Sequence, residues 1–426
     1  MTKWRGPSLT FQILLGLLVG IALGWLEPRW GVAIKPVADI FLRMIKMIIA
    51  PLIFSTLVIG IAGAGDFKKV GRIGLKAIIY FEIATTIALL IGLLTVNIFK
   101  PGEYIAKPAV IQSQPTPHSS ANVPAAPVTK SLSGKDFIIN IFPTSVVDAM
   151  ARGDILQLVI FSLFMGLALA AVGEKAKPLV SVLGALADTM FKFTDIVMRF
   201  APLGVLAAIA ATVGTKGLGV LKGYASLVTC FYGALVFFVF VVLFLICFII
   251  RVPFIRLFKA IREPFTIAFT TASSEAALPA AMESMERFGC PREIVGFVLP
   301  TGYSFNLDGA TLYLSLCSIF IAQVFAVPLD MKTQVAMMLT LMLTSKGVAG
   351  VPRGSLVVLA ATVPAFNLPM EGIALLLGID QILDMGRTAV NVTGNCVATA
   401  VVARWEGVLD DHKMLNLDPV TAEVPD

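Results

Sequence analysis

The sequence predicts an all-α polytopic membrane protein, and three observations support this fold class. Hydrophobic residues make up 57% of the 426 residues and charged residues only 14%. The mean hydropathy of +0.89 is typical of a chain that lies mostly in lipid. Several apolar runs reach the roughly 20 helical residues that cross a bilayer core, and the charged residues concentrate between these runs. A soluble chain of two or three domains, which this length would otherwise favour, is therefore rejected.

Six membrane helices are predicted before residue 259. They span residues 8–30, 36–65, 72–99, 136–173, 180–214 and 222–250. Several are longer than an untilted span requires, so tilted helices are expected. The first run is longer than a signal-peptide core and has no convincing cleavage site, which indicates a retained helix. Residues 101–134 are rich in Pro, Ser and Ala, which predicts a flexible extracytoplasmic loop.

Basic residues gather in alternate loops, as expected for a cytoplasmic N-terminus. These residues are Lys68, Lys69, Arg72, Lys76, Lys175, Lys177, Arg251, Arg256, Lys259 and Arg262. They account for the net charge of +6, so nucleic-acid binding is not indicated. The predicted location is the cell inner membrane, with a short cytoplasmic tail at 407–426. The five cysteines show no paired spacing, which predicts small buried side chains and neither a disulfide framework nor a metal cluster.

Residues 259–406 differ from residues 1–258 because small and polar residues interrupt their apolar runs. The interruptions lie at 270–275, 306–309, 345–352 and 380–395. Non-helical backbone at membrane depth is tolerated only where protein or a water-filled cavity satisfies its polar groups. The interruptions form two pairs, each a loop followed by a polar helix, which is the pattern of inverted repeats around a midplane site. We therefore expect the substrate site in this segment.

A polar stripe runs along a predicted helix at residues 372–404. Its members recur at helical spacing and share one face of that helix. They are Asp380, Asp384, Arg387, Thr388, Asn391 and Asn395. An ionised side chain at the bilayer centre is costly, so these residues are expected to face the protein interior and to be functional. The structural alternative is an Asp384–Arg387 ion pair that only joins helices.

The chemistry of the stripe indicates an acidic amino acid as the substrate. Arg387 carries a planar fork of donors suited to a carboxylate, and Asp384 carries an anion suited to an α-ammonium group. The Ser273-Ser274 loop and the loop at 347–352 can present backbone N–H groups to the α-carboxylate. Each loop alone is a common turn pattern, and only their pairing makes them informative.

Two features bear on a coupling cation. Asn306 and Asp308 supply oxygens of the kind that monovalent cations prefer, with turn capping by Asp308 as the alternative. Glu82 lies inside the third predicted helix, where a carboxyl group can carry a proton. Its alternative is a carboxylate that is hydrogen-bonded near a helix end.

These residues resemble the dicarboxylate/amino acid:cation symporter family, which includes archaeal aspartate transporters, bacterial glutamate carriers and animal excitatory amino acid transporters. The likeness covers nearly the whole chain. It is most specific in Ser273-Ser274 with Leu278-Pro279, Asn306-Leu307-Asp308-Gly309, GVAGVP at 347–352 and DMGRTAVNVTG at 384–394. The resemblance implies eight transmembrane helices and two re-entrant helical hairpins, at about 259–289 and 331–367. It also implies a scaffold domain, a transport domain built from 259–406 with the third and sixth helices, a homotrimer and an elevator-type movement.

By position, the resemblance implies substrate contacts from both hairpins and the last helix. The residues are Ser273, Ser274, Gly350, Val351, Asp384, Arg387, Thr388 and Asn391, and the second hairpin would be the extracellular gate. Asp384 favours amino acids over C4-dicarboxylates, and Arg387 argues against neutral amino acids. Ala310 and Thr311 leave the choice between glutamate and aspartate open. The predicted function is import of L-glutamate and L-aspartate coupled to cations, with no cofactor beyond the coupling ion.

This chain departs from the family pattern at the positions that bind the coupling cation. Sodium-coupled members commonly carry an acid at the position of Asn395, and Tyr and Thr where this chain has Phe81 and Ala84. Lys346 lies near backbone that would cage another sodium ion, where its charge is unfavourable unless the side chain points away. Proton coupling is therefore favoured over sodium, with one sodium site at Asn306, Asp308 and Asn391 still open. The implied cation-coupling set is Glu82, Thr85, Ser304, Asn306, Asp308, Asn391 and Asn395.

Three other functions stay open on the sequence. An intramembrane hydrolase would use Ser273 or Ser274, but the only histidines, His118 and His412, lie in polar segments outside the predicted membrane helices. A passive channel would spread its polar residues along a pore. The third function is C4-dicarboxylate:cation symport by the same fold.

Overall fold

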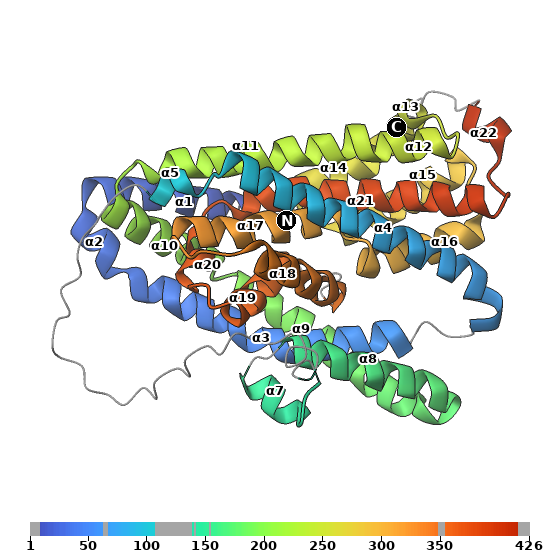
Figure 1. Cartoon of the computed structure of the whole chain (residues 1–426), viewed down its shortest axis with the longest axis horizontal. Helices are drawn as coiled ribbons and strands as arrows, with labels where there is room; N and C mark the ends of the chain where they lie inside the picture. The colour runs from blue at the N-terminus through green and yellow to red at the C-terminus, as the bar shows by residue number, and fades with distance from the viewer. Residues whose placement is uncertain are drawn as a thin grey trace, which may run out of the picture.

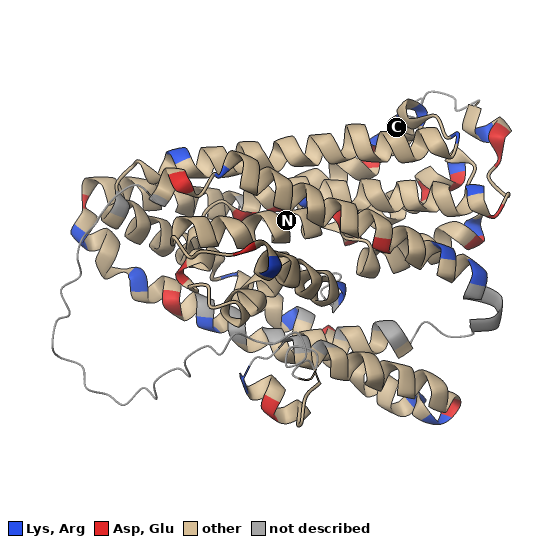
Figure 2. Ribbon diagram, viewed as in Figure 1, with Lys and Arg blue, Asp and Glu red and all other residues tan. Residues whose placement is uncertain are grey.

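The computed structural model describes residues 9–62, 67–106, 139, 142–152, 155–347 and 354–415, and the regular structure in these ranges is helical. Within them, three helical segments are long and apolar enough to cross a membrane: Arg72–Ile105, Val220–Ile249 and Arg292–Val324. A bent pair, Ile160–Met198 and Ala201–Thr215, meets at 50° and supplies up to one more span. Charged residues gather toward the two ends of the long helices and are sparse between them (Figure 2). The all-α membrane prediction is confirmed.

The first part of the chain forms α1 to α12. The bounds are α1 (Leu9–Leu26), α2 (Pro28–Ala33), α3 (Lys35–Ala62), α4 (Phe67–Phe99), α5 (Glu103–Ala106), α7 (Val146–Arg152), α8 (Ile155–Val172), a 3₁₀ turn η1 (Gly173–Ala176), α9 (Lys177–Met198), α10 (Ala201–Lys216), α11 (Val220–Phe237), a π-helical segment η2 (Phe238–Leu243) and α12 (Phe244–Ile249). In Figure 1, α4, α11 and α21 run side by side along the longest axis of the molecule.

Three of the six helices predicted before residue 259 are divided in the structure. The helix predicted at 8–30 ends at Leu26, and α2 begins at Pro28, because proline fits the first turn of a new helix but interrupts an existing one. Pro202 divides the helix predicted at 180–214 into α9 and α10 in the same way. The helix predicted at 136–173 is not one unit, since α7 and α8 are separate elements; residues 136–138, 140–141 and 153–154 lie outside the described residues. Most of the predicted loop at 101–134 lies outside the described residues.

The second part of the chain forms shorter helices. They are α13 (Phe254–Ala260), α14 (Arg262–Thr271), α15 (Ser274–Phe288), α16 (Arg292–Phe305), α17 (Asp308–Val324), α18 (Met331–Thr344), a 3₁₀ turn η3 (Ser345–Gly347), α19 (Gly354–Ala365), α20 (Glu371–Leu377), α21 (Asp380–Trp405) and α22 (Asp411–Leu415). Helices end at three of the predicted polar interruptions: α14 at 270–275, α16 at 306–309 and α18 at 345–352. The helix predicted at 372–404 is corrected to two helices, because α20 ends at Leu377 and α21 begins at Asp380.

Two sets of helices pack tightly. In the first set, α1 packs along α10, and α3 packs against α8, α9 and α10. In the second set, α21 packs against α14, α15, α16 and α17, and α17 also packs along α4. Every residue of α17 except Gln323 is buried, and a helix that is surrounded on all sides belongs to a core. The polar interruptions at 270–275, 306–309 and 380–395 therefore lie within the second set.

A glycine seam joins α1 to α10. Gly16, Gly20 and Gly24 recur every fourth residue, and a Cβ at each would lie 2.5–2.6 Å from a carbonyl oxygen of α10. Small residues at this spacing let two helix backbones approach closely, which is how helices commonly associate in membranes. The four-residue spacing of these glycines is visible in the sequence.

We expect Gly20→Leu to separate α1 from α10, because its side chain has no space between the two backbones. The cost of such overpacking is about 1–3 kcal/mol, and the measurement is the thermal unfolding midpoint of the purified protein. Gly184→Leu on α9 is the matched control, since a Cβ there meets nothing within 4 Å. Equal midpoints for the two variants would contradict the seam.

The five cysteines are unpaired thiols. Cys247, Cys290, Cys317 and Cys396 are buried, whereas Cys230 on α11 is only half-buried. The prediction of small buried side chains is confirmed for these four.

Candidate functional site

A cavity of about 80 Å³ lies among the breaks of the second helix set. Its lining comes from the start of α15, the facing sides of α16 and α17, the residues around η3 and α19, and the middle of α21. Every predicted substrate-binding residue that the structure describes lines this cavity: Ser273, Ser274, Asp384, Arg387, Thr388 and Asn391. Gly350 and Val351 lie outside the described residues. The roles of these residues stay predictions, but their convergence on one cavity is a finding.

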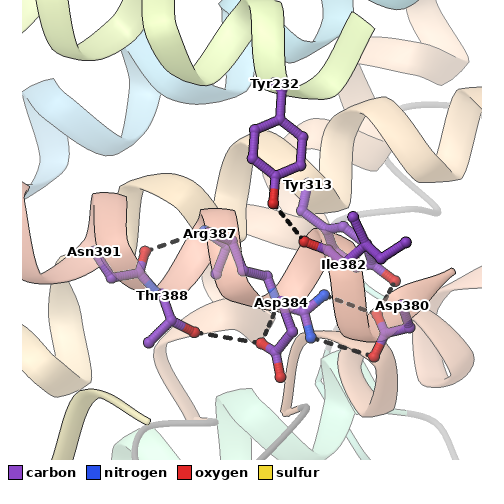
Figure 3. Close-up of polar contacts among 9 residues, drawn as sticks. Tyr232, Tyr313, Asp380, Ile382, Asp384, Arg387, Thr388 and Asn391 are labelled. Carbon is purple, nitrogen blue, oxygen red and sulfur yellow. Dashed lines mark hydrogen bonds and ion pairs between the residues drawn. The ribbon is translucent and has the colours of Figure 1, made fainter. Parts of the chain in front are cut away.

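Arg387 is the centre of a buried charge cluster on α21. Its Nε lies 2.7 Å from Asp384 Oδ1, and its Nη1 lies 2.9 Å from Asp380 Oδ1. The guanidinium carbon sits 4.3 Å from the ring centroid of Tyr313, and the Tyr313 hydroxyl donates to Asp380 Oδ1 at 3.0 Å. Figure 3 shows all three charged side chains reaching one another from the same helix. Because Arg387 is 1% exposed, its charge depends on these partners.

The Asp384–Arg387 ion pair anticipated as the structural alternative is therefore present, and Asp380 extends it. Asp380 was predicted on the stripe without a role, although its position seven residues before Arg387 puts it two turns away on the same face. Two carboxylates share one guanidinium in this arrangement. A ligand that brings both a cation and a carboxylate can exchange partners with Asp384 and Arg387 without leaving a buried charge alone.

Two close approaches hold α21 against α17. Asn391 Oδ1 accepts a hydrogen bond of 3.1 Å from the backbone N–H of Ala310, in the first turn of α17. A Cβ at Gly309 would lie 2.3 Å from the carbonyl oxygen of Arg387. The glycine of the Asn-Leu-Asp-Gly motif is thus required because α17 and α21 touch at this point. The contact holds Arg387 beside the break between α16 and α17.

The Ser273-Ser274 pair opens α15 at the cavity wall. Ala272 adopts the left-handed conformation with φ 50°, which ends α14 and reverses the chain. Ser273 is the N-cap of α15, and its Oγ accepts a hydrogen bond from the N–H of Ala276 at 3.3 Å. The N-terminal N–H groups of α15 therefore face the cavity, where a helix dipole favours an anion such as a carboxylate.

Asn306, Asp308 and Asn395 form a second polar cluster, which joins the break between α16 and α17 to α21. Asn306 Nδ2 donates to Asp308 Oδ2 at 3.2 Å and to Asn395 Oδ1 at 3.1 Å, and all three residues are 0% exposed. Asn306 Oδ1 and Asp308 Oδ1 are buried with no hydrogen-bond partner. Buried unsatisfied oxygens are rare and costly, and amide and carboxylate oxygens suit a hard monovalent cation, so this pair fits the predicted cation role.

The other predicted cation residues are placed differently. Asn391 contributes its side-chain oxygen to Ala310, as described above, and Ser304 is half-buried on α16. The carboxylate of Asp308 hydrogen-bonds Asn306, whereas Leu307 occupies the N-cap position of α17, so turn capping does not explain Asp308. Thr85 is fully buried on α4, where its hydroxyl meets Lys346.

Lys346 and Glu82 form an ion pair that the sequence analysis missed. Lys346 Nζ lies 3.0 Å from Glu82 Oε1. The Lys346 side chain does not point away from the predicted cation residues, because the same Nζ also contacts Thr85 and the carbonyl of Phe305. The alternative for Glu82, a carboxylate near a helix end, is wrong because Glu82 lies in the middle of α4. The pairing joins residues 264 positions apart, and neither residue alone predicts it.

Gly302→Ala is expected to disrupt the second cluster. A Cβ at Gly302 would lie 2.2 Å from Asn395 Oδ1, so the amide must move and its bond to Asn306 is lost. Alanine favours helices over glycine, so any loss reflects the contact, and we expect it to cost about 1–3 kcal/mol in unfolding free energy. The control is Gly296→Ala on the same helix, where a Cβ meets nothing within 4 Å. A Gly302→Ala protein as stable as the control would show that Asn395 is not held there.

Comparison with known proteins decides the family. Residues 9–405 match the model of the sodium:dicarboxylate symporter family. The chain belongs to this family. It is therefore a cation-coupled symporter and a multi-pass membrane protein, not an enzyme, and the hydrolase hypothesis for Ser273 and Ser274 is wrong.

Curated members of the sodium:dicarboxylate symporter family differ in substrate at similar distance from this chain. It is 43% identical over 412 residues to a proton/sodium-glutamate symport protein of Geobacillus stearothermophilus, covering 96% of this chain and 97% of that protein. It is 42% identical over 421 residues to a proton/glutamate-aspartate symporter of Bacillus subtilis, covering 98% and 99%. It is 45% identical over 408 residues to a C4-dicarboxylate transport protein of Pseudomonas fluorescens, covering 96% and 91%. Overall identity does not select the substrate, so the cavity residues must.

Proposed function

We propose that this symporter imports L-glutamate and L-aspartate, with protons favoured over sodium as the coupling ion. The observation that carries the substrate assignment is the pairing of Asp384 with Arg387 at the wall of one cavity. An acidic amino acid offers an ammonium group to Asp384 and a side-chain carboxylate to Arg387. The α-carboxylate then faces the N-terminus of α15 and the hydroxyls of Ser273 and Ser274.

The same cavity makes a C4-dicarboxylate a poorer ligand. Such a substrate carries two carboxylates and no ammonium, so it would meet Asp384 with like charge. The C4-dicarboxylate relatives are as similar to this chain as the glutamate relatives, so C4-dicarboxylate transport is the second candidate. It would require that the charge of Asp384 be neutralised when the substrate binds.

We further propose the architecture that the family resemblance implies. It has eight transmembrane helices, re-entrant hairpins at about 259–289 and 331–367, and inverted repeats. The helices that pack around α3 and α10 would form the scaffold domain, and those that pack around α17 and α21 the transport domain. A homotrimer in the cell inner membrane, with a cytoplasmic N-terminus, would support elevator-type alternating access, with residues 331–367 as the outer gate.

Proton coupling rests on Glu82, Lys346 and the altered cation positions. Glu82 is a carboxyl group in the middle of α4 whose side chain is 42% exposed and pairs with Lys346, and a carboxyl group inside a membrane helix can carry a proton. Phe81 and Ala84 supply no oxygen ligands beside it. The oxygens of Asn306 and Asp308 keep a single sodium site as the alternative route to coupling.

The test is uptake of labelled L-glutamate and L-aspartate into proteoliposomes, with inward proton and sodium gradients imposed separately. We expect accumulation with the proton gradient alone, and competition by excess unlabelled aspartate but not by excess succinate. Accumulation that requires sodium would reject proton coupling, and succinate competition would favour the C4-dicarboxylate candidate. Vesicles without protein are the control.

A further inference from the structure

The ammonium group of Lys346 sits in a shell of oxygen atoms. Its Nζ donates to the Phe305 carbonyl at 2.6 Å, contacts Thr85 Oγ1 at 3.4 Å and pairs with Glu82 Oε1 at 3.0 Å. A carbonyl, a hydroxyl and a carboxylate are the oxygen types that hard monovalent cations take from proteins. The three oxygens come from α16 and α4, whereas the cation comes from η3.

We propose that Lys346 is a tethered cation, which occupies a monovalent-cation site formed by Phe305, Thr85 and Glu82 and thereby excludes sodium from it. This rests on the proposed function only in treating these residues as part of the coupling machinery. In this role Lys346 determines the ion specificity of the protein.

The backbone around Lys346 favours a positive charge. Phe305 is the last residue of α16, so its carbonyl belongs to the helix end that has no intrahelical partner and carries the negative end of the helix dipole. Such carbonyls at membrane depth require a partner, since lipid supplies none. Lys346 reaches Phe305 from the irregular turn after α18 and satisfies it directly.

Burial makes the cation necessary. The side chain of Lys346 is 12% exposed and Thr85 is 0% exposed, whereas the side chain of Glu82 is 42% exposed. The ammonium group itself is therefore largely buried, although one of its partners is not. Removing the ammonium would leave Glu82 without its opposite charge and the Phe305 carbonyl without its donor. A sodium ion from solution can satisfy both groups, whereas in the wild-type protein the tethered ammonium is always present.

The neighbouring cation pair is affected as well. Phe305 directly precedes Asn306, whose Oδ1 and that of Asp308 are the unsatisfied oxygens of the second cluster. The Lys346 ammonium, held at the Phe305 carbonyl, repels a sodium ion at those oxygens. Lys346 therefore disfavours sodium at its own site and beside it.

The experiment measures sodium binding by the purified protein without substrate, by radiolabelled sodium and by thermal unfolding in sodium chloride and in choline chloride at equal ionic strength. We expect Lys346→Ala to bind an additional sodium ion per chain relative to wild type and to gain a sodium-specific rise in unfolding midpoint. Lys332→Ala is the matched control, because Lys332 is an exposed lysine at the start of α18.

Lys346→Ser is measured beside Lys346→Ala, because its hydroxyl retains a partner for the Phe305 carbonyl if alanine folds poorly. Folding of either variant in sodium but not in choline is an expected result. The proposal is overturned if the folded variants bind no more sodium than Lys332→Ala, or if they stay unfolded in both salts. Since no substrate is present, an error in the amino-acid assignment changes neither outcome.

Discussion

Arg387→Lys is expected to abolish high-affinity binding of acidic amino acids while the protein remains folded. Lysine keeps the positive charge between Asp380 and Asp384 but loses the planar fork that binds a carboxylate at two points. Truncating a buried, hydrogen-bonded charge pair costs about 2–5 kcal/mol, which corresponds to a loss of roughly 30-fold to several-thousand-fold in affinity. The measurement is glutamate and aspartate binding by isothermal titration calorimetry.

Lysine is preferred to alanine for this test. Arg387→Ala would leave Asp380 and Asp384 buried without a cation, which costs about 3–5 kcal/mol in stability and mixes misfolding with lost affinity. Arg292→Lys is the control, since Arg292 is an exposed arginine on α16 with a side chain that is 89% exposed. If Arg387→Lys binds glutamate with wild-type affinity, the Arg387 guanidinium does not bind the substrate carboxylate.

Asp384→Ser is expected to invert the substrate preference. It removes the partner of the α-ammonium group, so glutamate and aspartate should lose about 2–5 kcal/mol of binding free energy. It also removes the like charge that opposes a C4-dicarboxylate, so succinate should bind more tightly than to wild type. Asp380 still neutralises Arg387, and the fold should persist. Competition of labelled glutamate with succinate and aspartate measures both changes.

The control for Asp384→Ser is Asp39→Ser, which removes an exposed carboxylate from α3. If Asp384→Ser binds glutamate as tightly as this control does, Asp384 serves only the ion pair within α21. That result would restore the structural alternative for the stripe and would remove the main argument for amino acids over C4-dicarboxylates.

The sequence alone predicted three helix breaks in the second part of the chain and the shared face of the polar stripe on α21. Polar interruptions in apolar runs carry that information locally, because lipid cannot satisfy exposed backbone groups. The face shared by Asp384, Arg387 and Asn391 follows from helical spacing in the same way. The helix boundaries near Pro28 and Pro202 follow from the same kind of local information, because proline starts a new helix more readily than it continues one.

Contacts between distant segments were not predictable. The pair of Lys346 with Glu82 depends on how η3 packs against α4, and no local pattern fixes that packing. The partnership of Asp380 with Tyr313 likewise requires α17 to lie beside the start of α21. In both cases the residue types were visible in the sequence, but their partners lay in other helices.

The distribution of cysteines determines how motion between the two helix sets can be followed. Because Cys247, Cys290, Cys317 and Cys396 are buried, a thiol reagent should meet Cys230 first. Replacing that one residue with serine would give a background nearly silent to spin labels. Cysteines introduced at exposed positions of α3 and α15 would then carry paired labels, and electron-spin distance distributions between them would separate a sliding domain from a fixed bundle.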